Sequence, residues 1–416
     1  MQLKRVVVTG IGALTPLGKT PDAYWEGLIN GVSGADFITQ FDCSKFKTRF
    51  ACEVKDFDPT HYLDRKEARK IDRFTQFALV VSDQAMQDAG LSKATINADR
   101  AGVIFASGIG GLITFQEEVS AFALGDGTPR FNPFFIPKMI LDIAAGQISM
   151  RHGLRGPNFA VVSACASSTN AIIDAYDNIR LGKADIILSG GSEAVVSAAG
   201  LGGFNAMKAL SERNDDPATA SRPFDKDRDG FVMGEGAGML ILEELEHALA
   251  RGARIYCEIG GGGATADAHH ITAPHPEGLG ATNVMKAALA DAGLQPSDID
   301  YINVHGTSTP LGDIAETKAI LNVFGEHAYQ LNISSTKSMT GHCLGAAGAL
   351  EAIACVLAVR NDVVPPTINH FTDDPELDAR LNFTFNKAQQ RTVRAALSNT
   401  FGFGGHNASL IVKKYS

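Results

Sequence analysis

One of the six cysteines has surroundings that favour chemistry. Cys165 lies in VVSACASSTNA, where an apolar strand-like run ends and an amphipathic helical pattern begins. A thiol at a helix N-terminus faces unpaired backbone N–H groups and the positive end of the helix dipole. Both effects lower the pKa of the thiol and favour the nucleophilic thiolate. We therefore expect Cys165 to be a nucleophile, and we interpret the other five cysteines as small buried side chains.

Two histidines lie in Gly- and Thr-rich turns between strand and helix patterns. His305 follows an apolar run in NVHGTSTPLGD, and His342 follows Lys337 in STKSMTGHCLGAAG. Taken singly, each is more typical of a hydrogen-bonded structural histidine than of a catalytic one. One cysteine and two histidines could also form a zinc set. They lie far apart in the sequence and lack paired ligand spacing, so we do not expect a metal site.

Two further glycine-rich segments accompany these residues. In SNTFGFGGHN, Phe401 and Phe403 alternate with glycines that permit close backbone approach or a hinge. SRPFDKDRDGFVMGEGAG, residues 221–238, is a charged loop that runs into a glycine-rich strand pattern. It lacks the spacing and the following Lys-Ser/Thr of a nucleotide-binding loop, so nucleotide binding is not expected.

The elements that must position these residues alternate along the whole chain. Short β-branched runs and longer helical patterns follow one another, which predicts an α/β protein with mixed or parallel sheets covered by helices. The expected strands are Arg5–Thr9, Gly102–Ala106, Phe159–Val162, Asp185–Ser189, Gly238–Leu242, Ile255–Ile259, Ile299–Val304, Gln330–Ile333, Ala395–Ser398 and Ser409–Val412. The expected helices include Asp72–Ala89, Met139–Met150, Ala166–Leu181, Ala281–Ala292, Asp313–Phe324 and Ala346–Arg360.

The polar helical stretch Glu243–Arg254 is the best candidate for a domain boundary, which divides the chain into residues 1–253 and 254–416. The two parts resemble each other faintly, since each contains a strand, a turn of small residues and a long helix around Cys165 or His342. Two chance strand–helix units explain this resemblance nearly as well as a duplication does.

Composition limits the function classes. The formal net charge of −9 argues against a nucleic-acid binder that depends on phosphate contacts. The cysteines form no CxxC pair, the N-terminus has no signal-peptide pattern, and no run of about 18 apolar residues offers a membrane span. We expect a cytoplasmic protein with reduced thiols, without membrane insertion.

Five motifs in order carry a family resemblance. ACASSTNA, PFDKDRDGFVMGEGAG, VHGTSTPLGD, STKSMTGHCLGAAG and SNTFGFGGHN together resemble the β-ketoacyl-acyl-carrier-protein synthases, over essentially the whole chain. The resemblance implies a thiolase-like α/β fold, in which two similar βαβαβαββ halves form a five-layered α-β-α-β-α core. It also implies a homodimer. The nucleophilic cysteine would lie in the N-terminal half and both catalytic histidines in the C-terminal half.

The resemblance implies a decarboxylative Claisen condensation of acyl- and malonyl-loaded acyl carrier protein, as in fatty-acid elongation. Cys165 would accept the acyl chain, and its backbone N–H would form an oxyanion hole with that of Phe401. His305 and His342 would donate hydrogen bonds to the malonyl thioester carbonyl, so that loss of CO₂ leaves a stabilised enolate. No cofactor is implied.

Supporting, substrate-binding and docking residues follow from the same resemblance. Ile109 in SGIGG would limit the acyl pocket. Lys66, Arg69 and Lys70 share one face if DRKEARKID is helical, and a basic patch on an acidic chain can steer an acidic carrier. A solvated charged face is the alternative. The remaining implied residues are Lys337 and Glu351 beside the histidines, Thr272, Thr307, Thr309 and Phe403 around the substrate, and Lys208 in the docking patch.

Two other functions stay open. A thiolase also forms an acyl-cysteine but usually uses a second cysteine as its base, and the two-histidine set fits the decarboxylative branch better. A chain-length-factor type of partner subunit typically lacks the nucleophilic cysteine, whereas Cys165 is intact.

Overall fold

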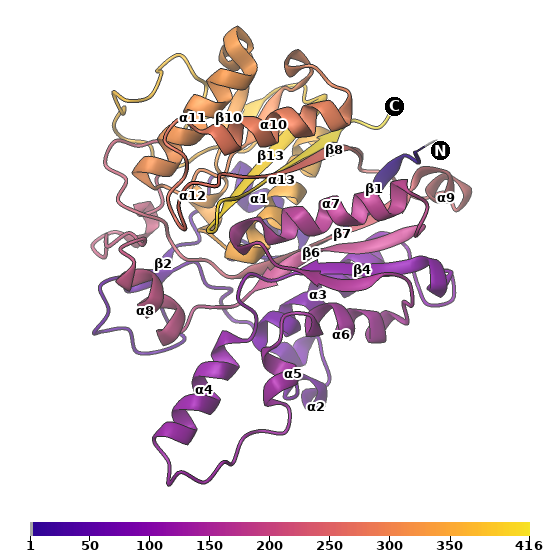
Figure 1. Ribbon diagram of the computed structural model, residues 1–416, viewed down its shortest axis with the longest axis vertical. Coiled ribbons are helices and arrows are strands. Elements are labelled where there is room, and N and C mark those ends of the chain that lie inside the picture. Colours follow the sequence, from indigo (N-terminus) through magenta and orange to yellow (C-terminus); the bar gives the residue numbers. More distant parts are fainter. Residues whose placement is uncertain (1–2) are drawn as a thin grey trace.

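The computed structural model describes residues 3–416, and these form two halves with the same order of elements (Figure 1). Each half reads βαβαβαββ, as the family resemblance implies. The first half contains β1 (Val6–Leu14), α3 (Arg73–Asp88), β4 (Ala101–Ala106), α6 (Ile143–His152), β5 (Asn158–Val161), α7 (Ser167–Arg180), β6 (Ile186–Glu193) and β7 (Gly236–Glu244). The second half contains β8 (Cys257–Ala266), α10 (Leu279–Ala292), β9 (Tyr301–Asn303), α11 (Pro310–Phe324), β10 (Asn332–Ser334), α13 (Ala347–Asn361), β13 (Ala395–Gly402) and β14 (His406–Lys413).

The strands pair in the order β10-β9-β13-β14-β8-β1-β7-β6-β4-β5. Read outward from the β8–β1 junction, both halves have the same internal order, with the first strand of each half at the centre. The junction itself is short, since only Val7 pairs with Glu258 and Val8 with Cys257. The repeat that is faint in the sequence is therefore complete in the topology.

The helices and sheets form five layers, and this confirms the predicted thiolase-like architecture (Figure 1). Helices α3 and α6 cover the outer face of the first half-sheet, and α10 and α11 cover the outer face of the second. Helices α7 and α13 lie between the two half-sheets. The segment Leu344–Asn361, which includes α13, is long and apolar enough to cross a membrane, but it is buried in this central layer as a core helix is.

Shorter elements extend from this core. They are α1 (Pro21–Ile29), β2 (Asp36–Phe37), β3 (Phe50–Ala51), α2 (Arg65–Ala68), α4 (Leu112–Ala123), α5 (Phe135–Met139), α8 (Ala198–Ala206), α9 (Leu245–Ala250), α12 (Lys337–Thr340), β11 (Val363–Val364) and β12 (Gln389–Gln390). Helices α4 and α5 and the loop between them form an arm, residues 112–139, that projects from the body (Figure 1).

The ten predicted strands and six predicted helices are all present, with shifted ends. Helix α11 begins at Pro310, three residues before the prediction, because proline is favoured at the first helical position. The predicted helical stretch 243–254 is partly wrong. β7 continues to Glu244, and only Leu245–Ala250 forms a helix, α9.

Candidate active site

A cavity of about 470 Å³ lies where the carboxyl ends of strands from both halves meet. Cys165 follows β5, His305 follows β9, His342 follows β10 and α12, and Phe401 lies at the end of β13. All four residues line the cavity. The structure therefore brings together the residues that the sequence analysis singled out from four separate motifs.

Cys165 lies in a tight turn between β5 and α7. The preceding residue, Ala164, has φ of +52°, in the left-handed region that costs a non-glycine residue energy. A single 3₁₀ turn, Ala164–Ala166, then leads into α7. This turn places the Cys165 Sγ 3.0 Å from Nε2 of His342. The cysteine is thus presented to the cavity with a histidine in direct contact.

The expected lowering of the thiol pKa is wrong. Burial raises the pKa of Cys165 to about 12, although the Lys337 ammonium and the backbone N–H of Phe403 oppose the rise. The side chain of Cys165 is only 7 % exposed, so its thiolate loses most of its solvation. This loss raises the pKa more than the turn and the helix N-terminus lower it. The resting side chain is therefore a neutral thiol, and it needs a proton acceptor to become a nucleophile.

The two histidines meet at the cavity wall. Their ring centroids lie 5.3 Å apart and their planes are nearly perpendicular, at 87°. Burial, reinforced by Lys337, lowers the pKa of both His305 and His342 well below the ordinary value, so both rings are neutral at neutral pH. Nδ1 of each ring is buried without a hydrogen-bond partner among the described residues, so neither tautomer is fixed.

Lys337 and Glu351 form a buried ion pair behind the histidines. Lys337 Nζ donates to Glu351 Oε1, and both side chains are almost fully buried. Burial raises the pKa of Glu351 to about 7, and the lysine opposes that rise. Neither residue lines the cavity. Their position fits a supporting role, because a buried ammonium sets the potential at both imidazoles without touching a ligand.

The glycine-rich turn after β13 lies against the backbone of the cysteine turn. A Cβ at Gly402 would lie 2.6 Å from the Ser163 carbonyl oxygen and 3.2 Å from the Cys165 backbone nitrogen, so only glycine permits this approach. Phe401 and Phe403 both line the cavity, and the Phe401 ring lies 5.6 Å from that of His305. The backbone at Gly402 therefore packs directly against the backbone of the cysteine turn.

The implied substrate-binding residues also line the cavity, namely Ile109, Thr272, Thr307, Thr309 and Phe403. The Thr307 and Thr309 hydroxyls lie 3.0 Å apart at the start of α11. Ile109 lies in the turn after β4, where its backbone N–H donates to Glu193 at 3.1 Å.

The docking residues are only partly arranged as predicted. Lys66, Arg69 and Lys70 are exposed, but α2 ends at Ala68, so Arg69 and Lys70 do not continue its face. The helix ends there because Asp72 caps the next helix, α3. Lys208 lies at the cavity, after α8, whereas α2 lies beside α5 (Figure 1). Within one chain, Lys208 does not join the other three.

Two buried carboxylates that the sequence analysis missed hold the site in place. Glu316 accepts hydrogen bonds from the backbone N–H groups of His305 and Gly306, both at 2.9 Å. Glu193 accepts from Gly108, Ile109 and Gly345. The available signal for Glu316 was its place nearly two helical turns into the helix that begins at Pro310, directly after the His305 loop.

A buried cysteine facing two neutral histidines, in a thiolase-like fold, defines a class of acyl-transferring condensing enzymes. The chain belongs to the β-ketoacyl synthase family: residues 3–248 match the family model "Beta-ketoacyl synthase, N-terminal domain" and residues 256–371 match "Beta-ketoacyl synthase, C-terminal domain". It is 52% identical over 415 residues to a 3-oxoacyl-[acyl-carrier-protein] synthase 2 of Synechocystis sp., covering 100% of this chain and 99% of the relative. A Staphylococcus aureus protein of the same name is 51% identical over 415 residues, with the same coverage.

Solved structures show the same fold. The ishigamide ketosynthase/chain length factor aligns with a TM-score of 0.93 at 36% identity, and a β-ketoacyl synthase from Burkholderia phymatum with 0.92 at 36%. A type II polyketide ketosynthase in complex with its acyl-carrier protein aligns with 0.91 at 34%. Each alignment covers 100% of both chains.

Proposed function

We propose that this protein is a 3-oxoacyl-acyl-carrier-protein synthase, which condenses an acyl thioester with a malonyl thioester in fatty-acid elongation. The observation that carries the proposal is the 3.0 Å contact between Cys165 Sγ and His342 Nε2, with His305 at the same cavity wall. A second cysteine base, as in a thiolase, has no support. Of the six cysteines, all within the described residues, only Cys165 lines the cavity.

The first half-reaction moves the acyl group to Cys165. His342 Nε2 accepts the thiol proton while Sγ attacks the acyl carbonyl, and the proton passes to the departing carrier thiol. The oxyanion of the tetrahedral intermediate would accept hydrogen bonds from the backbone N–H groups of Cys165 and Phe401. The product is acyl-Cys165 and the free carrier thiol.

The second half-reaction forms the carbon–carbon bond. The malonyl C–C bond breaks, CO₂ leaves, and the electron pair becomes an enolate whose oxygen accepts hydrogen bonds from Nε2–H of His305 and of His342, after the His342 ring has changed to the tautomer protonated at Nε2. The enolate carbon attacks the acyl-Cys165 carbonyl, and the cysteine sulfur leaves as a thiolate that takes a proton from solvent to restore the resting thiol. Lys337 and Glu351 would set the electrostatic potential at the two rings, and Thr307, Thr309 and Thr272 would bind the arm of the carrier.

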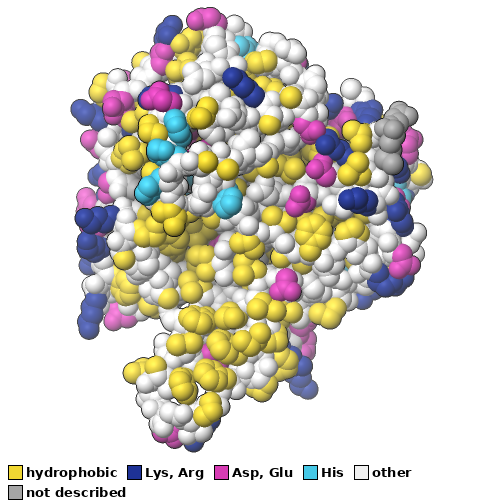
Figure 2. Space-filling model, in the orientation of Figure 1, with side chains coloured by type: hydrophobic (Ala, Val, Ile, Leu, Met, Phe, Trp, Pro, Cys, Tyr) yellow, Lys and Arg dark blue, Asp and Glu magenta, His cyan; other side chains and the backbone are white. Residues whose placement is uncertain are grey.

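A second copy of the chain completes the proposed enzyme. The arm exposes apolar side chains on one face of the molecule (Figure 2), and these are Phe115, Val119, Phe122, Leu124, Phe131, Phe134 and Ile136. Strand β5 lies at the edge of the central sheet and exposes Phe159. Exposed apolar area of this extent favours a homodimer. The chain would work in the cytoplasm with acyl carrier protein as its partner, and its halves would divide at residues 253 and 254.

The test is covalent labelling combined with CO₂ release. The wild-type protein should release CO₂ from malonyl-carrier protein and bind a radiolabelled acyl group from acyl-carrier protein. Cys165→Ala should bind no acyl group and form no 3-oxoacyl product. Acyl labelling of Cys165→Ala at the wild-type level would rule out this cysteine as the acyl carrier.

A further inference from the structure

The charged loop Ser221–Gly230 has no part in the proposed chemistry, yet it reaches the cavity. Asp229 and Gly230 at its end line the cavity together with Phe231. Lys226 and Asp227 of this loop are exposed, whereas three other charged residues, Arg222, Asp225 and Arg228, are buried. Burial of three charged side chains costs solvation energy, which their hydrogen bonds and ion pairs must offset. The partners in these contacts therefore indicate what the loop holds in place.

The loop holds the threonine turn at the cavity wall. The Gly230 N–H donates to the Ser308 carbonyl oxygen at 3.1 Å, and the Arg222 N–H donates to the Ser308 hydroxyl at 3.1 Å. Ser308 has φ of +68°, which is strained for a non-glycine residue. It lies between Thr307 and Thr309, which both line the cavity and whose hydroxyls lie 3.0 Å apart. The strained turn therefore depends on this loop for its conformation.

Arg228 joins the loop to the helix that follows the turn. Its guanidinium lies 3.2 Å from Asp313 Oδ2, donates to Asp374 Oδ2 at 2.6 Å and donates to the Pro310 carbonyl oxygen at 3.3 Å. Asp313 in turn accepts a hydrogen bond from the backbone N–H of Phe224 at 3.0 Å, and its own backbone N–H donates to the Thr309 carbonyl oxygen at 3.1 Å. Burial raises the pKa of Asp313 to about 6, and Arg228 opposes that rise, so the guanidinium keeps the acceptor ionised at neutral pH.

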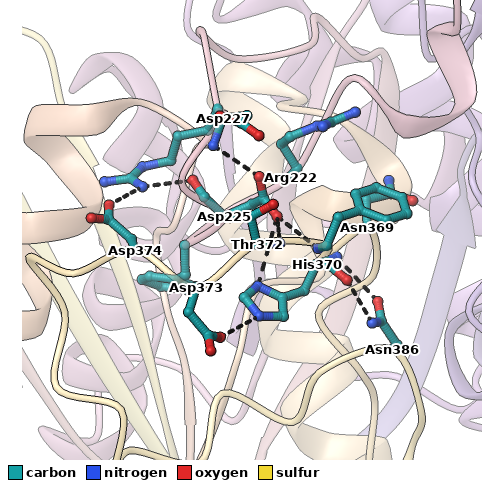
Figure 3. Close-up of polar contacts among 12 residues, drawn as sticks. Arg222, Asp225, Asp227, Asn369, His370, Thr372, Asp373, Asp374 and Asn386 are labelled. Atoms are coloured by element: carbon teal, nitrogen blue, oxygen red, sulfur yellow. Dashed lines mark hydrogen bonds and ion pairs between the residues drawn. The ribbon is translucent and has the colours of Figure 1, made fainter.

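Asp225 anchors the other side of the loop. Its fully buried carboxylate accepts from the backbone N–H groups of Phe371 at 2.7 Å and Thr372 at 2.8 Å. Figure 3 shows Asp225 in contact with the segment that contains Thr372, and Asp374 in a separate contact with an arginine side chain. Arg228 is thus held from one side by Asp374, while its contacts with Pro310 and Asp313 lie directly after the threonine turn.

We propose that Arg228 is a positioning residue that fixes the Thr307–Thr309 turn so that its two hydroxyls can bind the amide-bearing arm of a pantetheine thioester. The inference rests on the proposed function for the identity of that arm. Arg228 does not itself line the cavity. It acts through Asp313 and Pro310, and its loss would let the strained turn relax.

The experiment measures binding without turnover. N-propyl pantothenamide carries both amides of the arm and no thiol, so it should protect Cys165 from alkylation by iodoacetamide. In Arg228→Gln, the concentration that halves the alkylation rate should rise about tenfold, as expected when one or two charge-assisted hydrogen bonds are lost. Arg228→Lys, which keeps the charge beside Asp313, should restore most of the protection.

Arg251→Gln is the matched control. Arg251 forms a bidentate pair with the buried Glu243, 2.7 Å at both contacts, and neither residue lines the cavity. In Arg251→Gln, the pantothenamide should protect Cys165 from alkylation as well as it does in the wild type. Adding Arg228→Gln to Thr309→Val should weaken protection further by less than threefold, because the hydroxyl that Arg228 positions is already absent.

If Arg228→Gln does not fold, Asp374→Asn tests the same chain of contacts and should weaken protection about threefold. Unchanged protection in Arg228→Gln, or in Asp374→Asn where only that variant folds, would overturn the proposal. So would equal weakening in Arg251→Gln, or a wild-type protein that the probe does not protect. A wild-type protein that is protected but releases no CO₂ from malonyl-carrier protein would overturn the proposed function alone.

Discussion

At the scale of single residues, several groups act on Cys165 besides burial, and of these Glu193 and Glu351 raise its pKa further. His342 Nε2 lies 3.0 Å from Sγ, the Phe403 N–H donates toward it, and Lys337 lowers its pKa through the protein interior. Burial outweighs them and keeps the thiol protonated. During acyl transfer the cysteine becomes nucleophilic when His342 takes its proton. A simple alkylating reagent instead reacts with the small fraction of thiolate in the free protein, and this fraction rises with pH.

This gives a pH prediction for the free protein. Because the pKa of Cys165 is raised to about 12, the thiolate fraction increases about tenfold for each pH unit below that value. The second-order rate constant for inactivation by iodoacetamide should rise from pH 6 to pH 10 without levelling off. Slower inactivation in the presence of a bound pantothenamide would confirm that the reagent reacts in the cavity. A plateau between pH 7 and pH 9 would show that the pKa is lowered after all.

The two histidines should differ in the half-reactions they serve. Alanine at either position removes a hydrogen-bond donor worth about 3 kcal/mol, so decarboxylation of malonyl-carrier protein should slow about 100-fold or more. Acyl transfer to Cys165 should suffer in His342→Ala, which loses the contact with Sγ, and much less in His305→Ala. Single-turnover measurements of CO₂ release and of acyl labelling separate the two steps. Equal losses in both steps for His305→Ala would contradict the assignment.

At the scale of elements, the turn after β4 is held rigidly at the cavity. Glu193, fully buried at the end of β6, accepts from three consecutive backbone N–H groups of that turn, Gly108 to Gly110. Ile109 is therefore presented to the cavity by a backbone that has little freedom to yield.

Ile109→Phe should shorten the acyl chain that the enzyme accepts. The larger Phe side chain in a wall that cannot move should weaken the binding of substrates that reach it by about 1–3 kcal/mol. Relative kcat/KM values for acyl-carrier proteins of graded length should fall for long chains and stay close to wild type for short ones. Ile109→Val, which makes the wall smaller, is the matched control and should not exclude long chains. An unchanged length profile in Ile109→Phe would remove this residue from the acyl pocket.

The basic residues around α2 make a separate prediction. Reversal of Lys66, Arg69 and Lys70 to Glu should raise KM for carrier-bound substrates many-fold, and the effect should shrink as salt rises. Each exposed pair contributes only about 0.2–1 kcal/mol, so the triple change is needed. Turnover of the corresponding coenzyme A thioesters should change little. If both substrate types suffered equally, these charges would be a solvated surface.

At the scale of the whole molecule, the two halves contribute different parts of one site. The first half supplies the cysteine turn and the second supplies both histidines and the threonine turn. The arm, residues 112–139, belongs to neither core and carries its apolar side chains outward (Figure 2).

Charges on the arm should therefore disrupt self-association. Phe122→Asp combined with Ile136→Asp should convert the protein from a species of twice the 44.0 kDa chain mass to the single-chain mass in light scattering. Burial of a charge in an apolar interface is costly, so two substitutions suffice. Leu249→Asp on α9, where the leucine is also exposed, is the control and should leave the mass unchanged. A wild-type protein of single-chain mass would refute the homodimer.

The sequence by itself determined the elements and the chemistry-bearing turns. Period-two and helical patterns are local, and they located all ten strands of the central sheet and the helices that cover it. Small residues around Cys165, His305 and His342 marked the strand ends where these residues lie. The repeat order of the two halves came only from the family resemblance, because topology leaves almost no local signal.

Only the tertiary structure decided how these groups interact. The pKa of Cys165 depends on its burial. The roles of Glu316 and Arg228 depend on contacts with other segments, since Glu316 accepts from the His305 turn and Arg228 pairs with Asp313. Helix α2 ended early because its neighbour α3 required Asp72 as a cap. Burial and long-range pairing arise when the chain is packed, so a pattern within one segment cannot contain them.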